Sequence, residues 1–166
     1  MSEPLELVPP RHRVPSRAMR WWTVRAAITD VVLLAVVAGC AVWLRGVLPG
    51  ALLTAIAVVA VLTAAAYLVL MPRVRYRVHR WEVTADAVYT SSGWVWQEWR
   101  VAPLSRVQTV DTERGPLQQL FGLATVTVTT ASSAGAVKIA GLSHEVAKDV
   151  VRTLTAVTQS TPGDAT

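Results

Sequence analysis

Two long apolar runs, separated by six residues, constrain this chain more than any other feature of its sequence. The first run, residues 26–44, contains one charge at Asp30, and the second, residues 51–71, contains none. Because an α-helix rises about 1.5 Å per residue, each run as a helix would match the ~30 Å hydrocarbon layer of a bilayer. In lipid, a helix satisfies all the backbone polar groups of such a segment internally. The sequence therefore predicts a two-helix transmembrane hairpin over residues 16–72, with spans at about 26–44 and 51–71.

Arginines are concentrated on one side of this hairpin. Five of them precede the first apolar run and four follow the second within ten residues, whereas the connecting loop holds only Arg45. The cytoplasmic flanks of transmembrane helices carry the excess of Lys and Arg. We therefore expect a multi-pass membrane protein with its N- and C-termini both in the cytoplasm.

The single cysteine, Cys40, excludes an intrachain disulfide. The three residues before it, Val-Ala-Gly, also fit the pattern that precedes a lipidated cysteine in bacterial lipoprotein signal peptides. Against that interpretation, the charged leader is long, Asp30 interrupts the apolar stretch, and apolar residues continue beyond Cys40. A signal peptide ends instead at its small-residue cleavage site. A membrane helix is the favoured interpretation, and lipidation of Cys40 is the alternative.

The chain on either side of the hairpin differs from it in composition. Residues 1–15 contain four prolines and no apolar periodicity, so we expect a disordered cytoplasmic tail there, and another over residues 160–166. Residues 73–159 are predicted to form one cytoplasmic domain. Short segments rich in Val, Thr, Tyr and Trp alternate there with turn residues, which predicts an all-β barrel or sandwich. The predicted strands cover residues 75–84, 87–90, 95–101, 107–112, 124–130 and 137–139.

One helix is predicted to follow the strands, over residues 144–157. Ser143 suits its N-cap, and Val146, Val150, Leu154 and Val157 recur at helical spacing. The predicted fold class is therefore a membrane α-helical hairpin plus an all-β domain capped by a C-terminal helix.

Two stretches of this domain resemble a known family. Residues 103–111, PLSRVQTVD, and residues 115–126, GPLQQLFGLATV, resemble the bacterial pleckstrin-homology-like domain of the YdbS type, in which two transmembrane helices precede one such domain. The resemblance implies a partly open β-barrel or sandwich with a capping helix. It also implies a non-enzymatic protein of the bacterial inner (plasma) membrane, often encoded beside a larger paralogue with tandem domains and linked to resistance against cell-envelope stress. Members often carry a basic residue where this chain has Gln119.

The domain sequence shows no motif for catalysis or cofactor binding. Its histidines, His79 and His144, have no metal-ligand spacing, no Gly-x-Ser-x-Gly elbow occurs, and no Gly-rich phosphate loop follows a strand. We therefore expect a protein that is not an enzyme and has no catalytic residue, metal site or cofactor.

The first group of candidate site residues is the membrane-proximal cluster Arg73, Arg75, Arg77 and Arg80. In an extended segment the first three would point to one side. Each basic residue near an anionic leaflet gains about 1 kcal/mol of attraction. A role in setting membrane topology would by itself explain the cluster. The alternative interpretation is a binding site for anionic lipid headgroups that also docks the domain against the bilayer.

The second group is the aromatic pair Trp94 and Trp96, in a small domain that also contains Trp81 and Trp99. Core packing is one interpretation. In the other, an exposed Trp94/Trp96 pair inserts at the headgroup level or anchors a partner protein.

The third group lies in the stretches that resemble the family. Arg106 and Gln108 are candidate partner-binding residues. The remaining residues, Pro103, Gly115, Pro116, Leu117, Phe121 and Gly122, are assigned to a structural motif. We expect its glycines to permit tight turns, and Leu117, Leu120 and Phe121 to plug the sandwich as a short helical turn. The alternative is a recognition surface centred on Arg106.

These observations favour a membrane-anchored binding or assembly module that contacts the bilayer and a membrane-protein partner, either a second copy or a tandem-domain paralogue. Anionic-lipid binding or sensing in envelope-stress resistance is the alternative function. A transporter or channel subunit is disfavoured because the spans lack paired polar residues. No feature indicates binding to nucleic acid.

Overall fold

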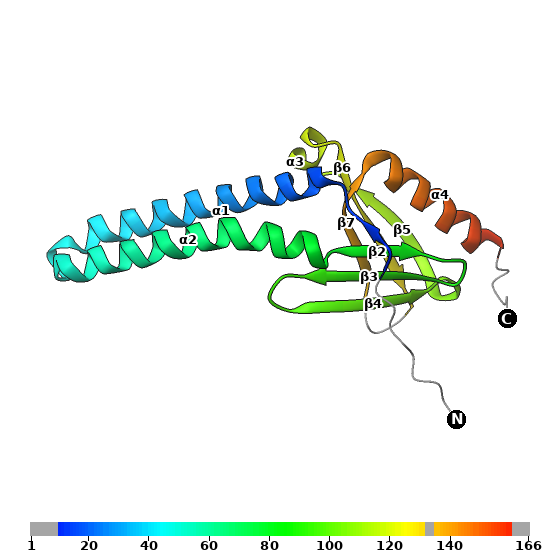
Figure 1. Cartoon of the computed structure of the whole chain (residues 1–166), viewed down its shortest axis with the longest axis horizontal. Coiled ribbons are helices and arrows are strands. Elements are labelled where there is room, and N and C mark those ends of the chain that lie inside the picture. The colour runs from blue at the N-terminus through cyan, green and yellow to red at the C-terminus, as the bar shows by residue number, and fades with distance from the viewer. Residues whose placement is uncertain (1–9, 132–134, 161–166) are drawn as a thin grey trace, which may run out of the picture. The chain divides into compact units, whose positions relative to one another are not determined.

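The computed structural model describes residues 10–131 and 135–160, with side chains up to residue 156. The chain divides into two compact units, one formed by Met19–Val74 and the other by Met1–Ala18 together with Arg75–Thr166. Figure 1 shows the order of the elements along the chain. The disordered C-terminal tail expected over residues 160–166 lies, apart from residue 160, outside the described residues.

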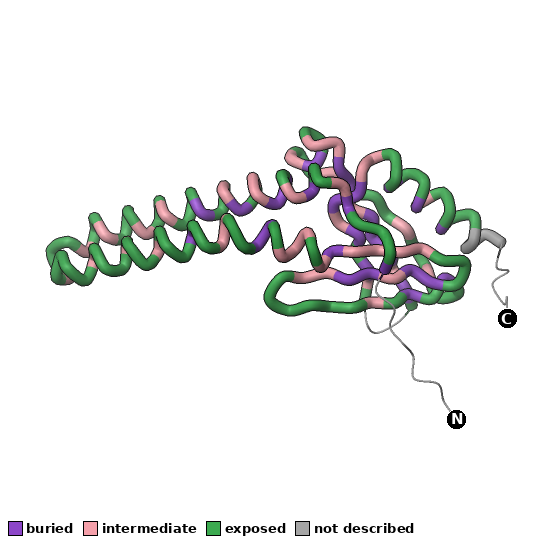
Figure 2. Tube along the Cα trace, viewed as in Figure 1, coloured by how far each residue is buried: buried purple, intermediate pink, exposed green. Residues whose placement is uncertain are grey.

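The first unit is a helical hairpin, as predicted. Helix α1 (Ser16–Trp43) and helix α2 (Gly50–Val78) are joined by the short helix η1 (Leu44–Gly46). Both long helices are apolar and long enough to cross a membrane. Most of their side chains are exposed, as the predominantly green tube of α1 and α2 shows in Figure 2. Such apolar exposure is expected of helices whose solvent is lipid.

Helix α2 does not end at Pro72 but continues to Val78. The segment from residue 75, expected to be a strand, is therefore helical as far as Val78. Proline removes one backbone donor, yet helices in membranes tolerate it because neighbouring groups satisfy the freed carbonyls. Because Pro72 has no N–H, the carbonyl it leaves without its helical donor is that of Leu68, four residues earlier. The guanidinium of Arg73 donates to the adjacent carbonyl oxygen, that of Val69, at 2.6 Å.

The second unit begins with an antiparallel sheet in the order β1-β2-β3-β4. Its strands are β1 (His12–Arg13), β2 (Arg80–Val83), β3 (Ala87–Gly93) and β4 (Gln97–Pro103). The expectation of a disordered tail over residues 1–15 is wrong for β1, which pairs with β2. The ring of His12 lies 5.2 Å from that of Trp81, and the backbone N–H of Arg11 donates to Glu82. These contacts involve residues distant in sequence, which composition alone does not reveal.

A second antiparallel sheet follows in the order β5-β6-β7. Its strands are β5 (Val107–Glu113), β6 (Leu123–Thr130) and β7 (Val137–Ser143), with the short helices η2 (Leu104–Arg106) and α3 (Pro116–Leu120) on either side of β5. Val126 and Val128 are fully buried on one face of β6, as the alternating sequence predicts. The expected fold class is thus confirmed.

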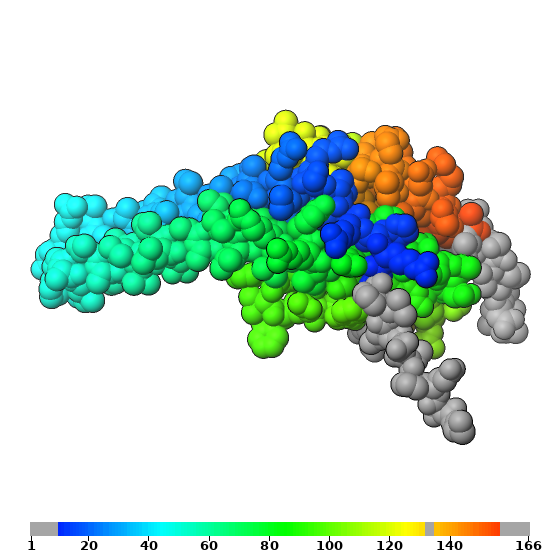
Figure 3. All heavy atoms as spheres, viewed as in Figure 1, coloured from blue at the N-terminus to red at the C-terminus, as the bar shows by residue number. Residues whose placement is uncertain are grey.

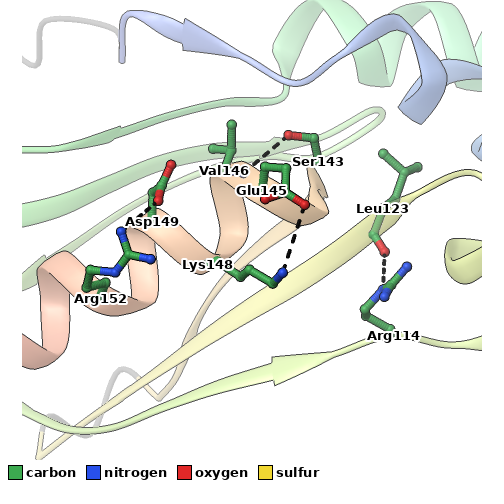
Figure 4. Close-up of polar contacts among 8 residues, drawn as sticks. All are labelled: Arg114, Leu123, Ser143, Glu145, Val146, Lys148, Asp149 and Arg152. Atoms are coloured by element: carbon green, nitrogen blue, oxygen red, sulfur yellow. Dashed lines mark hydrogen bonds and ion pairs between the residues drawn. The ribbon is translucent and has the colours of Figure 1, made fainter.

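Helix α4 (His144–Ser160) packs against β5, β6 and β7. The hydroxyl of Ser143 accepts from the backbone N–H of Val146, which confirms the predicted cap (Figure 4). Ala147, Val150 and Leu154 form the buried stripe. Val146, expected in that stripe, is exposed, because the helix is rotated so that Ala147 occupies the core position.

Candidate functional site

The membrane-proximal arginines do not share one side of an extended segment. Arg73, Arg75 and Arg77 lie on the last two turns of α2, and only Arg80 is in a strand. At 3.6 residues per turn, Arg73 and Arg77 fall on the same helical face, and both are exposed. Arg75 points elsewhere and is half-buried. The expected one-sided cluster is therefore reduced to Arg73 and Arg77.

The charge of Arg75 instead affects the pKa of His79, the residue that connects α2 to β2. His79 is buried, with 1% of its surface exposed. The pKa of its imidazole is lowered from 6.5 to about 4, mainly by burial and also by the charge of Arg75, while a backbone hydrogen bond with Ala140 raises it. The imidazole is neutral at pH 7 and inaccessible to a ligand. His79 is therefore a structural residue at the start of the domain.

The two candidate tryptophans lie in the tight connection between β3 and β4. Trp94 is 39% exposed, Val95 61% and Trp96 86%. Trp99, within β4, is also 44% exposed. Core packing, the favoured interpretation of the tryptophans from sequence, is therefore wrong for Trp96 and accounts for only part of the surface of Trp94. In Figure 3 the light-green atoms of this connection protrude from the surface of the domain.

Arg106 and Gln108 are also exposed, but the structure does not bring them together with Trp94 and Trp96. The tryptophans precede the first residue of β4, whereas Arg106 ends the short helix η2 that follows its last residue. Seven residues of strand span about 20 Å. The candidate partner-binding residues therefore divide into two separate surfaces at opposite ends of β4.

A hollow of about 300 Å³ lies beside Arg106, between β4 and the second sheet. Its lining includes Trp99, Arg100, Val101, Arg106, Thr130 and Val137. A second hollow, of about 240 Å³, adjoins the other side of Arg100 and includes Glu98 and Lys138. We call β4 and these two hollows the open side of the domain.

Arg100 separates the two hollows, and sequence reasoning missed it. Its Nε and Nη2 atoms contact a carboxylate oxygen of Glu98 at 2.7 and 2.6 Å. Its Nη1 donates to the carbonyl oxygen of Ala136 at 2.9 Å, just before β7. Arg100 thus connects the two sheets. The spacing of Glu98 and Arg100, which places opposite charges on one face of a strand, was the available signal.

The residues of the predicted structural motif surround helix α3. Gly115 and Pro116 begin it, Phe121 follows it, and Gly122 has a φ of +64° that favours glycine. Pro103 precedes η2, whose first residue, Leu104, is buried.

The prediction that Leu117, Leu120 and Phe121 plug the sandwich is wrong in detail. Leu120 is 78% exposed, and Leu117 and Phe121 are half-buried. The buried side chain is that of Gln118. Its amide nitrogen donates to the hydroxyl of Thr125 at 2.7 Å, and its carbonyl oxygen accepts from the backbone N–H of Gly115 at 3.0 Å. The neighbouring Gln119 is exposed and donates to the carbonyl of Arg114.

Within residues 10–131 and 135–160, no group of three or more His, Cys, Asp or Glu side chains is placed to hold a metal ion. The features with binding potential on this domain are therefore its exposed tryptophans, its open side and its basic residues.

Comparison with known proteins agrees with this architecture. The family model described as "Bacterial PH domain" matches residues 23–158. The UPF0699 transmembrane protein YdbS of Bacillus subtilis (strain 168) is 31% identical over 133 residues, which cover 75% of this chain and 79% of that protein. The search of solved structures gave no match.

Proposed function

This chain belongs to the bacterial PH domain family, and from that premise we propose that it is a membrane-anchored, non-enzymatic binding module. The PH domain would lie on the cytoplasmic side of the bacterial plasma membrane and hold a protein partner in the cell envelope. The partner would be another membrane protein, a second copy of this chain or a paralogue with tandem domains. The similarity to a transmembrane protein supports the membrane location.

The main support for this proposal is the open side of the domain. Among the strands that the structure describes, β4 pairs with β3 alone, so its other edge has no strand partner. Sheet edges bind extended peptides by adding a strand, and neighbouring pockets take up alternate side chains. Trp99 and Val101, 44% and 46% exposed, supply apolar surface beside the larger hollow.

The charges of the open side indicate the kind of segment that it would bind. Arg100 is engaged by Glu98, whereas Arg106 is exposed and forms no ion pair with any described residue. Aromatic residues and Arg are the side chains that most often dominate binding energy at protein interfaces. We therefore expect an extended partner segment with apolar side chains and an acidic group opposite Arg106.

Photo-crosslinking of the full chain in intact membranes tests this function. A photoreactive amino acid at Trp99 should crosslink to one defined protein, whereas the same group at Thr153, exposed on α4, should not. Arg106→Glu should weaken the Trp99 crosslink, and Lys148→Glu on α4 should leave it unchanged. Equal, unspecific crosslinking from Trp99 and Thr153 would contradict the proposal.

Anionic-lipid binding in envelope-stress resistance is the second candidate function, favoured by the exposed pair Arg73 and Arg77. Purified full-length protein should then retain anionic lipid in mild detergent, and Arg73→Gln with Arg77→Gln should reduce the amount retained. Lipid retention that is unaffected by these substitutions would exclude a lipid function for this pair.

A further inference from the structure

We propose that the tip of the β3–β4 hairpin, residues 94–96, inserts into the headgroup region of the bilayer that carries α1 and α2. This tip is a second membrane contact, made by the PH domain itself. It is distinct from the protein-binding function proposed above, because that function uses the open side, whose strand β4 begins at Gln97, after the tip.

The residues of the tip have the chemistry of the membrane–water interface. Its three residues, Trp94, Val95 and Trp96, are all apolar or amphipathic and all exposed, and Trp96 is exposed over 86% of its surface. No charge lies between Gly93 and Gln97. Tryptophan is enriched at membrane–water interfaces, because its ring is amphipathic and its indole N–H can remain hydrogen-bonded there.

The backbone of the tip forms a tight, constrained turn. The strands remain paired as far as Gly93 and Gln97, so three residues close the hairpin. Gly93 has a φ of +115°, and a Cβ at this position would overlap the carbonyl oxygen of Trp96. Glycine therefore permits a turn that other residues do not. A turn constrained in this way restricts the backbone that carries the two tryptophans, so less backbone entropy is lost when the tip binds.

The tip lies at the end of the first sheet where β2 begins. Arg80, the first residue of β2, pairs with Ser91, and β3 continues two residues beyond it to Gly93. One residue, His79, separates β2 from α2. The tip is therefore at the end of the sheet at which the chain arrives from a membrane helix, and β3 extends about 7 Å past Arg80 before the tip begins.

Basic side chains lie at the same end of the domain as the tip. The exposed Arg77 is where α2 ends, and Arg80 is where β2 begins. The nearest carboxylate in sequence, Glu98, is already paired with Arg100. The charge beside the tip is therefore positive, which complements an anionic leaflet. An anionic lipid surface can bind both the apolar tip and the basic side chains beside it. We therefore infer that the tip contacts lipid.

A fluorescent probe at Val95 tests the insertion in the full-length protein. Cys40 is the only cysteine, so a Cys40→Ser, Val95→Cys chain can be labelled at the tip alone. The protein is reconstituted into vesicles of phosphatidylglycerol and phosphatidylethanolamine. We expect iodide in the water to quench the tip probe severalfold less than a probe at Lys148→Cys, which is exposed on α4. Nitroxide lipids labelled near the headgroup should quench the tip probe more strongly.

The double substitution Trp94→Ser, Trp96→Ser should prevent insertion of the tip. Trp96 is 86% exposed and its substitution should change the thermal unfolding of the domain little, whereas Trp94 is 39% exposed and its substitution should cost more. Iodide quenching of the Val95 probe should rise towards the value at Lys148. If the double variant is destabilised, the single variant Trp96→Ser replaces it. Iodide quenching of the Val95 probe should then rise by a smaller amount.

Three results would overturn the proposal. The tip probe could be as accessible to iodide as the Lys148 probe. Its protection could disappear as the protein is diluted in lipid, which would show that a second copy covers the tip. Protection in native membranes but not in pure lipid vesicles would identify a partner protein as the occupant.

Discussion

At the scale of single residues, His79 couples the stability of the domain to pH. The pKa of its imidazole falls from 6.5 to about 4 on folding, so the folded state favours the neutral form. The resulting stabilisation is present above pH 6.5 and is lost as the pH falls from 6.5 towards 4. The shift corresponds to about 3 kcal/mol at most. We expect the melting temperature of the domain to fall across this range.

The substitution His79→Gln tests this pH dependence, because glutamine does not titrate there. Its melting temperature should be lower than that of the natural chain at pH 7 but should change less between pH 6.5 and 4. His144→Gln, at the start of α4, is the control and should retain the pH dependence of the natural chain. If the melting temperature of the His79→Gln variant falls between pH 6.5 and 4 as steeply as that of the natural chain, other titrating groups cause the pH dependence.

Gly93 is the residue whose backbone the β3–β4 turn depends on most. We expect Gly93→Ala to destabilise the domain by about 1–3 kcal/mol, because alanine combines an unfavourable positive φ with overlap against the Trp96 carbonyl. Gly50→Ala, at the start of α2, meets no atom within 4 Å and should change stability by a few tenths of a kcal/mol. Thermal or chemical unfolding of both variants provides the comparison, and equal effects would contradict the turn geometry.

At the scale of elements, helix α3 depends on a buried polar side chain rather than on apolar plugging. Gln118→Ala would leave the Gly115 N–H and the Thr125 hydroxyl without their partner, which costs about 1–3 kcal/mol. Gln119→Ala removes an exposed bond to Arg114 and should cost less than about 0.5 kcal/mol. Unfolding by denaturant measures both. A larger loss for Gln119 than for Gln118 would show that α3 is held differently.

The elements also show what the sequence could and could not predict. Periodicity located the two apolar helices, β5, β6 and the C-terminal helix, because each pattern there is strong. Periodicity did not predict where α2 ends or that β1 exists. Pro72 suggested a helix end, yet α2 continues to Val78, and β1 was missed because two residues carry no alternation. Pairing between residues 12–13 and 80–81 is a tertiary contact that local pattern does not encode.

The candidate site was predictable in its residue types but not in its arrangement. The exposure of Trp94 and Trp96 follows from a hairpin turn at positions that the sequence assigned in part to a strand. The role of Arg100 depends on a carbonyl 36 residues away, at Ala136. The distinction between Gln118 and Gln119 likewise depends on the orientation of a single helical turn.

At the scale of the whole molecule, the proposals for both binding surfaces depend on the membrane topology. The distribution of arginines predicts that the η1 loop faces outward and that the PH domain faces the cytoplasm. In a Cys40→Ser chain, a cysteine placed at Val47, which is 76% exposed, should react with a membrane-impermeant maleimide in intact cells. A cysteine at Lys148 should react only after the membrane is permeabilised. Labelling of Lys148 in intact cells would reverse the topology, and the open side and the tryptophan tip would then contact partners and lipids of the outer leaflet.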